Sequence, residues 1–165
     1  MGCEKDFPFH HLTPCPFPRR KNVAMRCCNK VYSLTLEERD KIIGRLVDFL
    51  KDHQEVSFAY AYGSFAEGIP FHDIDIGVYI AGIKEEGSTM YALELAQDIS
   101  HVERIPVDIR VLNYAPLLFL YHVIKGQLVF ERDEDIRIDI THKTVQRYLD
   151  IKPMIRMGIK EAFSA

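Results

Sequence analysis

Hydrophobic residues recur along the chain with the spacing of a helix in some segments and as short continuous runs in others. Thr35-Leu36-Glu37-Glu38 matches the S/T-x-x-E capping box that begins many helices. Apolar residues follow at i, i+3, i+4 and i+7, namely Ile43, Leu46, Val47 and Leu50. This pattern predicts an amphipathic helix over about residues 35–53, and the apolar run after it predicts a strand over 56–62.

The rest of the chain alternates between the same two patterns. We expect strands over about 74–80, 106–112 and 128–131, and helices over about 88–102, 116–125 and 134–162, the last with a kink at Pro153. Gly68 and Pro70 predict irregular chain between the first two strands, and residues 82–87 suggest a polar loop. The expected order α-β-β-α-β-α-β-α predicts an α/β (α+β) fold with a small mixed β-sheet flanked by helices.

The first 30 residues follow neither pattern. They carry four of the eight prolines and all four cysteines, Cys3, Cys15, Cys27 and Cys28. We therefore divide the chain into an irregular N-terminal arm, residues 1–30, and a domain, residues 31–165, that includes the long C-terminal helix. No cysteine pair has the C-x-x-C spacing, so reduced thiols are expected, with a zinc site completed by His10 or His11 as the alternative.

Composition indicates a globular protein and excludes a membrane span. The chain has 165 residues, of which 47% are hydrophobic and 27% charged. Its longest apolar run, residues 114–121, is far shorter than the roughly 20 residues that a spanning helix needs. The N-terminus has no apolar signal segment and no myristoylation pattern, so we expect a cytoplasmic protein.

Charge is distributed unevenly between the arm and the domain. Residues 1–30 hold six Lys/Arg and two Asp/Glu, whereas residues 31–165 hold 15 and 22, a net charge of −7. Non-specific nucleic-acid binding needs many cations against phosphates, so an acidic domain argues against it. A small phosphorylated ligand that arrives with Mg²⁺ remains compatible with this charge.

Three aspartates are the first candidates for chemistry. Asp73 and Asp75 lie two residues apart at the start of a predicted strand, so both side chains project from one face of the sheet. Asp108 alternates with apolar residues in another predicted strand, which allows it to lie near them. Crowded carboxylates with no His or Cys in the pattern favour Mg²⁺ or Mn²⁺. The alternative is an Asp108–Arg110 ion pair beside two solvated aspartates.

Gly63-Ser64 adds a second feature at the end of the preceding strand. A glycine lets a ligand approach the backbone closely, and exposed N–H groups with a hydroxyl can hold phosphate oxygens. A lone Gly-Ser is more often a simple turn. The order of strand, Gly-Ser, short segment, Asp-x-Asp strand, helix and Asp-bearing strand is more specific than any of its parts.

The segment from Tyr62-Gly63-Ser64 through Asp73-Ile74-Asp75 resembles the signature of the DNA polymerase β-type nucleotidyltransferase superfamily, in particular its minimal (MNT) members. The resemblance covers about residues 34–150. It implies that Asp73, Asp75 and Asp108 are catalytic and ligate two Mg²⁺ ions, and that Gly63 and Ser64 bind the triphosphate of ATP. Eight residues separate Ser64 from Asp73, fewer than is usual in the family, and His72 stands where serine is common.

The resemblance also suggests a partner. Minimal nucleotidyltransferases are commonly paired with HEPN proteins in toxin–antitoxin modules, and we expect a chain of this length to leave no room for a second substrate-binding domain. We therefore expect a protein adenylyltransferase that transfers AMP from ATP to a tyrosine of a HEPN-type toxin and acts as its antitoxin. The alternatives are a non-catalytic nucleotide- or partner-binding module, and an enzyme for small molecules whose acceptor site is built by a homodimer.

Three secondary expectations concern residues outside the signature. His72 is expected to pack or hydrogen-bond locally rather than to ligate metal, and Arg110 to form an ion pair rather than a phosphate contact. A set of apolar residues near the C-terminus is expected to pack in the core rather than to form a partner surface: Met154, Ile155, Met157, Ile159 and Phe163.

Overall fold

A computed structural model describes residues 30–162. Residues 1–29, with all four cysteines and the alternative zinc site, lie outside the described residues, as does Phe163. The elements in chain order are α1 (Leu36–Lys51), β1 (Val56–Tyr62), α2 (Gly63–Glu67), β2 (Ile74–Ile80), α3 (Glu85–Glu103), β3 (Val107–Val111), α4 (Leu117–Ile124), β4 (Gln127–Glu131) and α5 (Glu134–Ala162).

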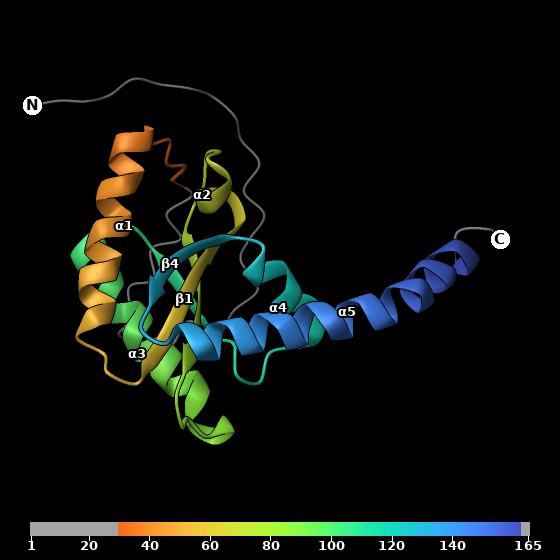
Figure 1. Cartoon of the computed structure of the whole chain (residues 1–165). Coiled ribbons are helices and arrows are strands. Elements are labelled where there is room, and N and C mark those ends of the chain that lie inside the picture. The colour runs from red at the N-terminus through yellow and green to blue at the C-terminus, as the bar shows by residue number, and fades with distance from the viewer. Residues whose placement is uncertain (1–29, 163–165) are drawn as a thin grey trace, which may run out of the picture.

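The four strands form one mixed sheet, which confirms the predicted fold class (Figure 1). Their order is β3-β2-β1-β4, with β1 antiparallel to both β2 and β4, and β2 parallel to β3. The parallel pair requires a crossover, and α3 supplies it. The strand that carries Asp108 therefore lies directly beside the strand that carries Asp75.

Helices cover both faces of the sheet and divide the core in two. On one face, α3 packs against β3, and α1 packs against β4 and α3, in a core that includes Leu46, Leu95 and Ile76. On the other face, α4 and the first part of α5 pack against β1 through residues such as Val123 and Phe58. Because β1 is covered on both faces, all seven of its residues are buried, as its continuous apolar run predicted.

Two elements differ from the sequence prediction. The chain between β1 and β2 was expected to be irregular, yet Gly63–Glu67 forms the short helix α2, bounded by Gly63 and by Gly68, a left-handed C-cap with φ 81°. Helix α3 begins at Glu85, inside the expected loop, because Glu85 and Glu86 suit the positive end of a helix. Helix α5 contains Pro153, where the sequence predicts a kink, within its span of Glu134–Ala162.

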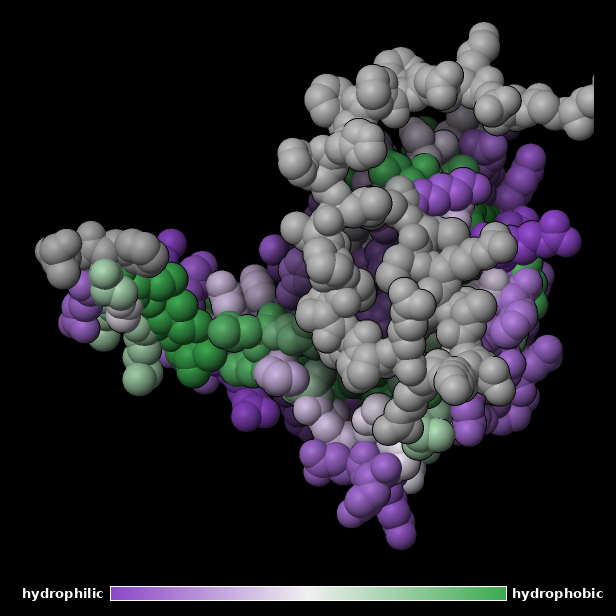
Figure 2. Space-filling view, turned by 180° about the vertical axis from the view of Figure 1, so that it is seen from behind, coloured by the Kyte–Doolittle hydropathy of each residue, from purple (hydrophilic) through white to green (hydrophobic). Residues whose placement is uncertain are grey.

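The outer part of α5 leaves the body of the protein (Figure 1). The expectation that its apolar residues pack in the core is wrong, because Met154, Met157 and Ile159 are 67%, 58% and 56% exposed and Ile155 is only half-buried. Figure 2 shows hydrophobic side chains along this projecting part. No helix in the described part of the chain, α5 included, is long and apolar enough to cross a membrane.

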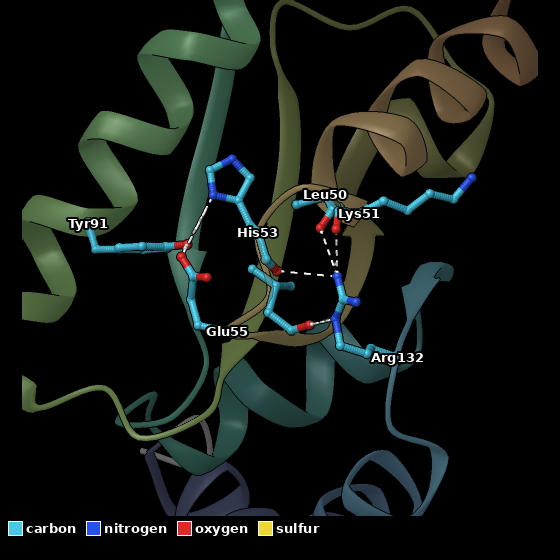
Figure 3. Close-up of polar contacts among 7 residues, drawn as sticks. Leu50, Lys51, His53, Glu55, Tyr91 and Arg132 are labelled. Carbon is cyan, nitrogen blue, oxygen red and sulfur yellow. Dashed lines mark hydrogen bonds and ion pairs between the residues drawn. The ribbon is translucent and has the colours of Figure 1, made fainter.

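Polar contacts fix the connection between α1 and β1 at the end of the sheet where β1 begins (Figure 3). The Arg132 guanidinium donates to the carbonyl oxygens of Lys51, at 2.9 Å, and of His53, at 3.4 Å. Nearby, the Tyr91 hydroxyl donates to Glu55. This hydrogen bond is the largest cause that lowers the pKa of Glu55. Asp75 pairs with the other end of β1, so these contacts stabilise the fold away from the aspartates.

Candidate active site

Asp75 and Asp108 are direct neighbours in the sheet. The parallel register of β2 and β3 pairs Asp75 with Asp108, and the antiparallel register of β1 and β2 pairs Asp75 with Tyr62. All three side chains lie on the sheet face that α4 partly covers, because the alternate residues Ile74, Ile76 and Ile109 belong to the core on the opposite face. Asp73 precedes β2 by one residue, and its negative charge acts on Asp75.

The surroundings of Asp75 disfavour its negative charge. Burial, and after it the charges of Asp73 and Asp108, raise the pKa of the Asp75 carboxyl to about 6, while Arg110 and His122 act in the opposite direction. Tyr62 is affected in the same way, since burial and then the charge of Asp75 raise its pKa to about 12. A cation bound among these carboxylates would offset the free-energy cost of ionising Asp75.

Asp108 is held by a neighbour on its own strand. The Arg110 Nε donates to Asp108 Oδ2 at 3.0 Å, which confirms the expected ion pair. Both side chains are substantially exposed, at 63% for Arg110 and 44% for Asp108, so the pair can open at little cost. Across residues 30–162 no three His, Cys, Asp or Glu side chains converge closely enough to form a ready metal cage. The oxygen donors of Asp73, Asp75 and Asp108 nevertheless match the chemistry of Mg²⁺.

Gly63 lies against Asp75 at the junction of β1 and α2. Its φ is +68°, and a Cβ atom at this position would stand 2.7 Å from Asp75 Oδ2. Glycine is therefore required both by the backbone conformation and by the close approach of the carboxylate. Ser64 follows in α2 and is half-buried, so its hydroxyl lies one residue from this contact.

Two cavities lie on opposite sides of the Asp75–Asp108 pair. One, of about 410 Å³, is lined on the β1 side by Tyr62, Gly63, Ala66, Glu67, His122, Lys125, Gly126 and Gln127. The other, of about 700 Å³, lies at the free edge of β3, between α3 and the start of α4, and includes Asp108, Arg110, Tyr114 and Phe119. The carboxylates thus stand between a small cavity with a mixed polar and apolar lining and a larger, mostly apolar one.

Arg39 supports the segment between Gly63 and Asp73, and the sequence analysis missed it. Its guanidinium donates to the carbonyl oxygens of Phe65 and Ile69, the latter at 3.0 Å, and the side chain is buried. A signal was present, because Arg39 is in helical phase with the buried Ile42 and Leu46 and is therefore a charged residue on an apolar face.

His72 lies beside this segment and makes a local contact. Its Nδ1 is 3.2 Å from the carbonyl oxygen of Lys30, and the side chain is exposed. This confirms the expectation of a local hydrogen bond. The shorter spacing between Ser64 and Asp73 is accommodated by α2 together with five connecting residues before Asp73.

The geometry agrees with what comparison with known proteins finds. Residues 45–135 match the sequence profile described as polymerase beta, nucleotidyltransferase. No curated protein sequence matches the chain. Solved structures do match it, and those described next share 19–21% of residues with it, a level at which the likeness concerns the fold.

Three of the matching structures are of toxin–antitoxin proteins. A tri-AMPylated Shewanella oneidensis HEPN toxin in complex with MNT antitoxin matches with a TM-score of 0.60 and 20% identity, covering 76% of this chain and 99% of the matched one. The toxin–antitoxin MntA-HepT matches with a TM-score of 0.59 and 19% identity, covering 76% and 99%. A toxin–antitoxin with AMP-PNP matches with a TM-score of 0.62 and 21% identity, covering 74% and 98%.

Proposed function

The chain belongs to the polymerase beta nucleotidyltransferase family, and from this premise we propose that it transfers AMP from ATP to a hydroxyl group in a Mg²⁺-dependent reaction. The observation that carries the proposal is the pairing of Asp75 with Asp108 across β2 and β3, beside Gly63. This arrangement provides carboxylates and a close-approach glycine in one place. Both are needed to bring a nucleotide's phosphates to a reacting hydroxyl.

Each residue of the signature has a distinct role in this proposal. Asp73, Asp75 and Asp108 would hold two Mg²⁺ ions, which neutralise phosphate charge when bound. Gly63 and Ser64 bind the triphosphate through the backbone and the Ser64 hydroxyl. Asp108 accepts the proton of the attacking hydroxyl once its contact with Arg110 opens.

The two cavities suggest the direction of the reaction. In-line displacement at the α-phosphorus requires the attacking oxygen and the leaving pyrophosphate to stand on opposite sides. The cavity beside Gly63 then takes the phosphates, and the cavity beside Asp108 takes the acceptor. Tyr114 and Phe119 give the acceptor side aromatic walls, which suit a tyrosine ring.

The acceptor we propose is a tyrosine of a HEPN-type partner protein, with this chain acting as the antitoxin. The support is that the structurally similar proteins include an MNT antitoxin bound to a tri-AMPylated HEPN toxin, and a toxin–antitoxin with AMP-PNP. The chain's own acidic domain, with a net charge of −7 over residues 31–165, favours a protein acceptor over a nucleic acid.

The test is intact-mass spectrometry of a HEPN-type partner after incubation with this protein, ATP and Mg²⁺. We expect mass increments of AMP units with the wild type and none with Asp75→Asn. If neither the wild type nor Asp75→Asn adds AMP, and Asp75→Asn still neutralises the partner's toxicity, the chain acts by binding alone. AMP addition that survives Asp75→Asn would contradict the assignment of the site.

A further inference from the structure

Two side chains at the end of α4 face the cavity beside Gly63. Both lie outside the sequence signature described above. His122 and Lys125 lie three residues apart, on one side of the helix end, and both line this cavity together with Gly63. Both residues are exposed to solvent. A ligand that entered the cavity would therefore meet an imidazole and an ammonium group opposite Gly63.

The position of α4 is fixed by a glycine of β2. A Cβ atom on Gly77 would lie 2.7 Å from Val123 Cγ1 and 2.9 Å from Leu112 Cδ2. The absence of that atom lets α4 sit directly on the sheet, and Val123 is completely buried there. Gly77 is two residues from Asp75 on the same face, so α4 packs immediately next to the carboxylates.

His122 is oriented by this packing. Its ring contacts the Tyr62 ring edge-to-face with centroids 5.9 Å apart, and Tyr62 pairs with Asp75 in the sheet. His122 is also close enough to Asp75 to lower its pKa against the stronger effect of burial. The imidazole thus lies on the phosphate side of the Asp75–Asp108 pair.

Lys125 provides a full positive charge at the mouth of the same cavity. Its Nζ stands 5.7 Å from the centroid of the Tyr121 ring, and it takes part in none of the ion pairs among residues 30–162. Among the residues that the structure describes, Glu67 is the one acidic residue that lines the cavity. The lysine attracts an anion that binds there, and the glutamate repels it. Neutralising the two residues should therefore change the affinity for the anion in opposite directions.

We propose that His122 and Lys125 hold the β- and γ-phosphates of the nucleotide and receive the pyrophosphate that leaves. This inference rests on the proposed function and adds two residues to it. The acceptor oxygen bonds to the α-phosphorus as the bond to the α,β-bridging oxygen breaks, and the electron pair remains on the pyrophosphate. The hydroxyl proton goes to Asp108. Lys125 and the N–H of His122 stabilise the negative charge that grows on this leaving group.

Isothermal titration calorimetry on the full chain tests the inference without needing an acceptor. ATP, AMP and inorganic pyrophosphate are titrated with Mg²⁺ and again in EDTA, against wild type, His122→Gln, Lys125→Gln and Lys125→Arg. Lys41→Gln is the matched control, because Lys41 is an exposed lysine on α1, which packs on the opposite face of the sheet. Glu67→Gln tests whether removing a negative charge from the cavity changes the affinity in the opposite direction.

We expect Lys125→Gln to weaken ATP and pyrophosphate binding about tenfold, as loss of a charge-assisted hydrogen bond implies, and AMP binding by less than about twofold. His122→Gln should weaken ATP binding severalfold, Lys125→Arg should restore it, and Glu67→Gln should tighten it. Equal losses for ATP and AMP, or equal effects of Lys125→Gln and Lys41→Gln, would overturn the inference alone. A wild type that binds neither ATP nor pyrophosphate would overturn the proposed function with it.

Discussion

Gly63 and Asp75 are in such close contact that a single added carbon atom would collide with the carboxylate. The position of a Gly63 Cβ lies 2.7 Å from Asp75 Oδ2, and the residue has a φ of +68°. The glycine that ends β1 and the second aspartate of the Asp-x-Asp pair are therefore one structural unit, although eleven residues lie between them in the sequence. Close packing against Asp75 is by itself enough to explain why glycine stands at this position.

This contact predicts the outcome of Gly63→Ala. The substitution should lower the free energy of unfolding by about 1–2 kcal/mol because alanine is strained at positive φ, and it should displace Asp75. Gly82→Ala is the matched control, since Gly82 has a φ of +71° with no atom within 4 Å of its Cβ position. Both variants should lose stability in urea denaturation, but only Gly63→Ala should lose Mg²⁺-dependent ATP binding. ATP binding retained by Gly63→Ala would contradict the prediction.

The raised pKa of Asp75 predicts a pH-dependent cost of folding. A carboxyl whose pKa rises from 3.8 to about 6 on folding binds its proton more tightly in the folded state, so stability falls as pH rises through this interval. Without metal, Asp75→Asn and wild type should be similarly stable near pH 3.5. At pH 7 the variant should be more stable by about 1–2 kcal/mol, a value reduced for solvent screening.

Denaturation series across this pH range, in EDTA and in Mg²⁺, measure the effect. Mg²⁺ should stabilise the wild type at pH 7 more than Asp75→Asn, since the variant lacks one of the three carboxylates proposed to hold the ion. Asp98→Asn on α3 is the control, because Asp98 is exposed and distant from β2 in sequence. A stability difference between Asp75→Asn and wild type that does not vary with pH would refute the argument.

The Asp108–Arg110 contact predicts that Arg110 competes with a bound cation. Arg110→Gln removes a single positive charge, which lies next to Asp108 and also lowers the pKa of Asp75. Mg²⁺ or Mn²⁺ should therefore bind about threefold more tightly to the variant, as measured by calorimetry. Arg45→Gln breaks an ion pair with Glu103 between α1 and α3 and should leave metal affinity unchanged. Unaltered metal affinity in Arg110→Gln would mean that the ion pair does not restrain Asp108.

Sequence patterns predicted the strands well because each strand is a continuous or alternating apolar run in a well-covered sheet. The predicted limits of β1 and β2, 56–62 and 74–80, agree with the structure, and the neighbouring positions of Asp75 and Asp108 follow from the two strands being adjacent. Helix α2 was missed because its two glycines were taken as breakers, whereas their positive φ angles begin and end a helical turn.

Residues brought to the site by tertiary packing could not be found in the same way. His122 and Lys125 reach the cavity only because α4 sits on Gly77, a contact between residues more than forty positions apart. The exposure of Met154 and Met157 has a similar cause, since a periodic apolar pattern does not reveal where a helix leaves the sheet. The local pattern thus predicted elements, and the packing of α4 and α5 decided which side chains meet.

The contacts of Arg39 predict that the chain between Gly63 and Asp73 depends on a buried positive charge. Arg39→Met removes the donors to the carbonyl oxygens of Phe65 and Ile69, so the free energy of unfolding should fall by about 2–4 kcal/mol. ATP binding should weaken in protein that is still folded, because the chain between Gly63 and Asp73 loses its support. Arg132→Met is the matched control, since Arg132 also donates to carbonyl oxygens but at the other end of β1. It should lower stability and leave ATP affinity intact. Equal loss of ATP affinity in both variants would show that the effect of Arg39 is on stability alone.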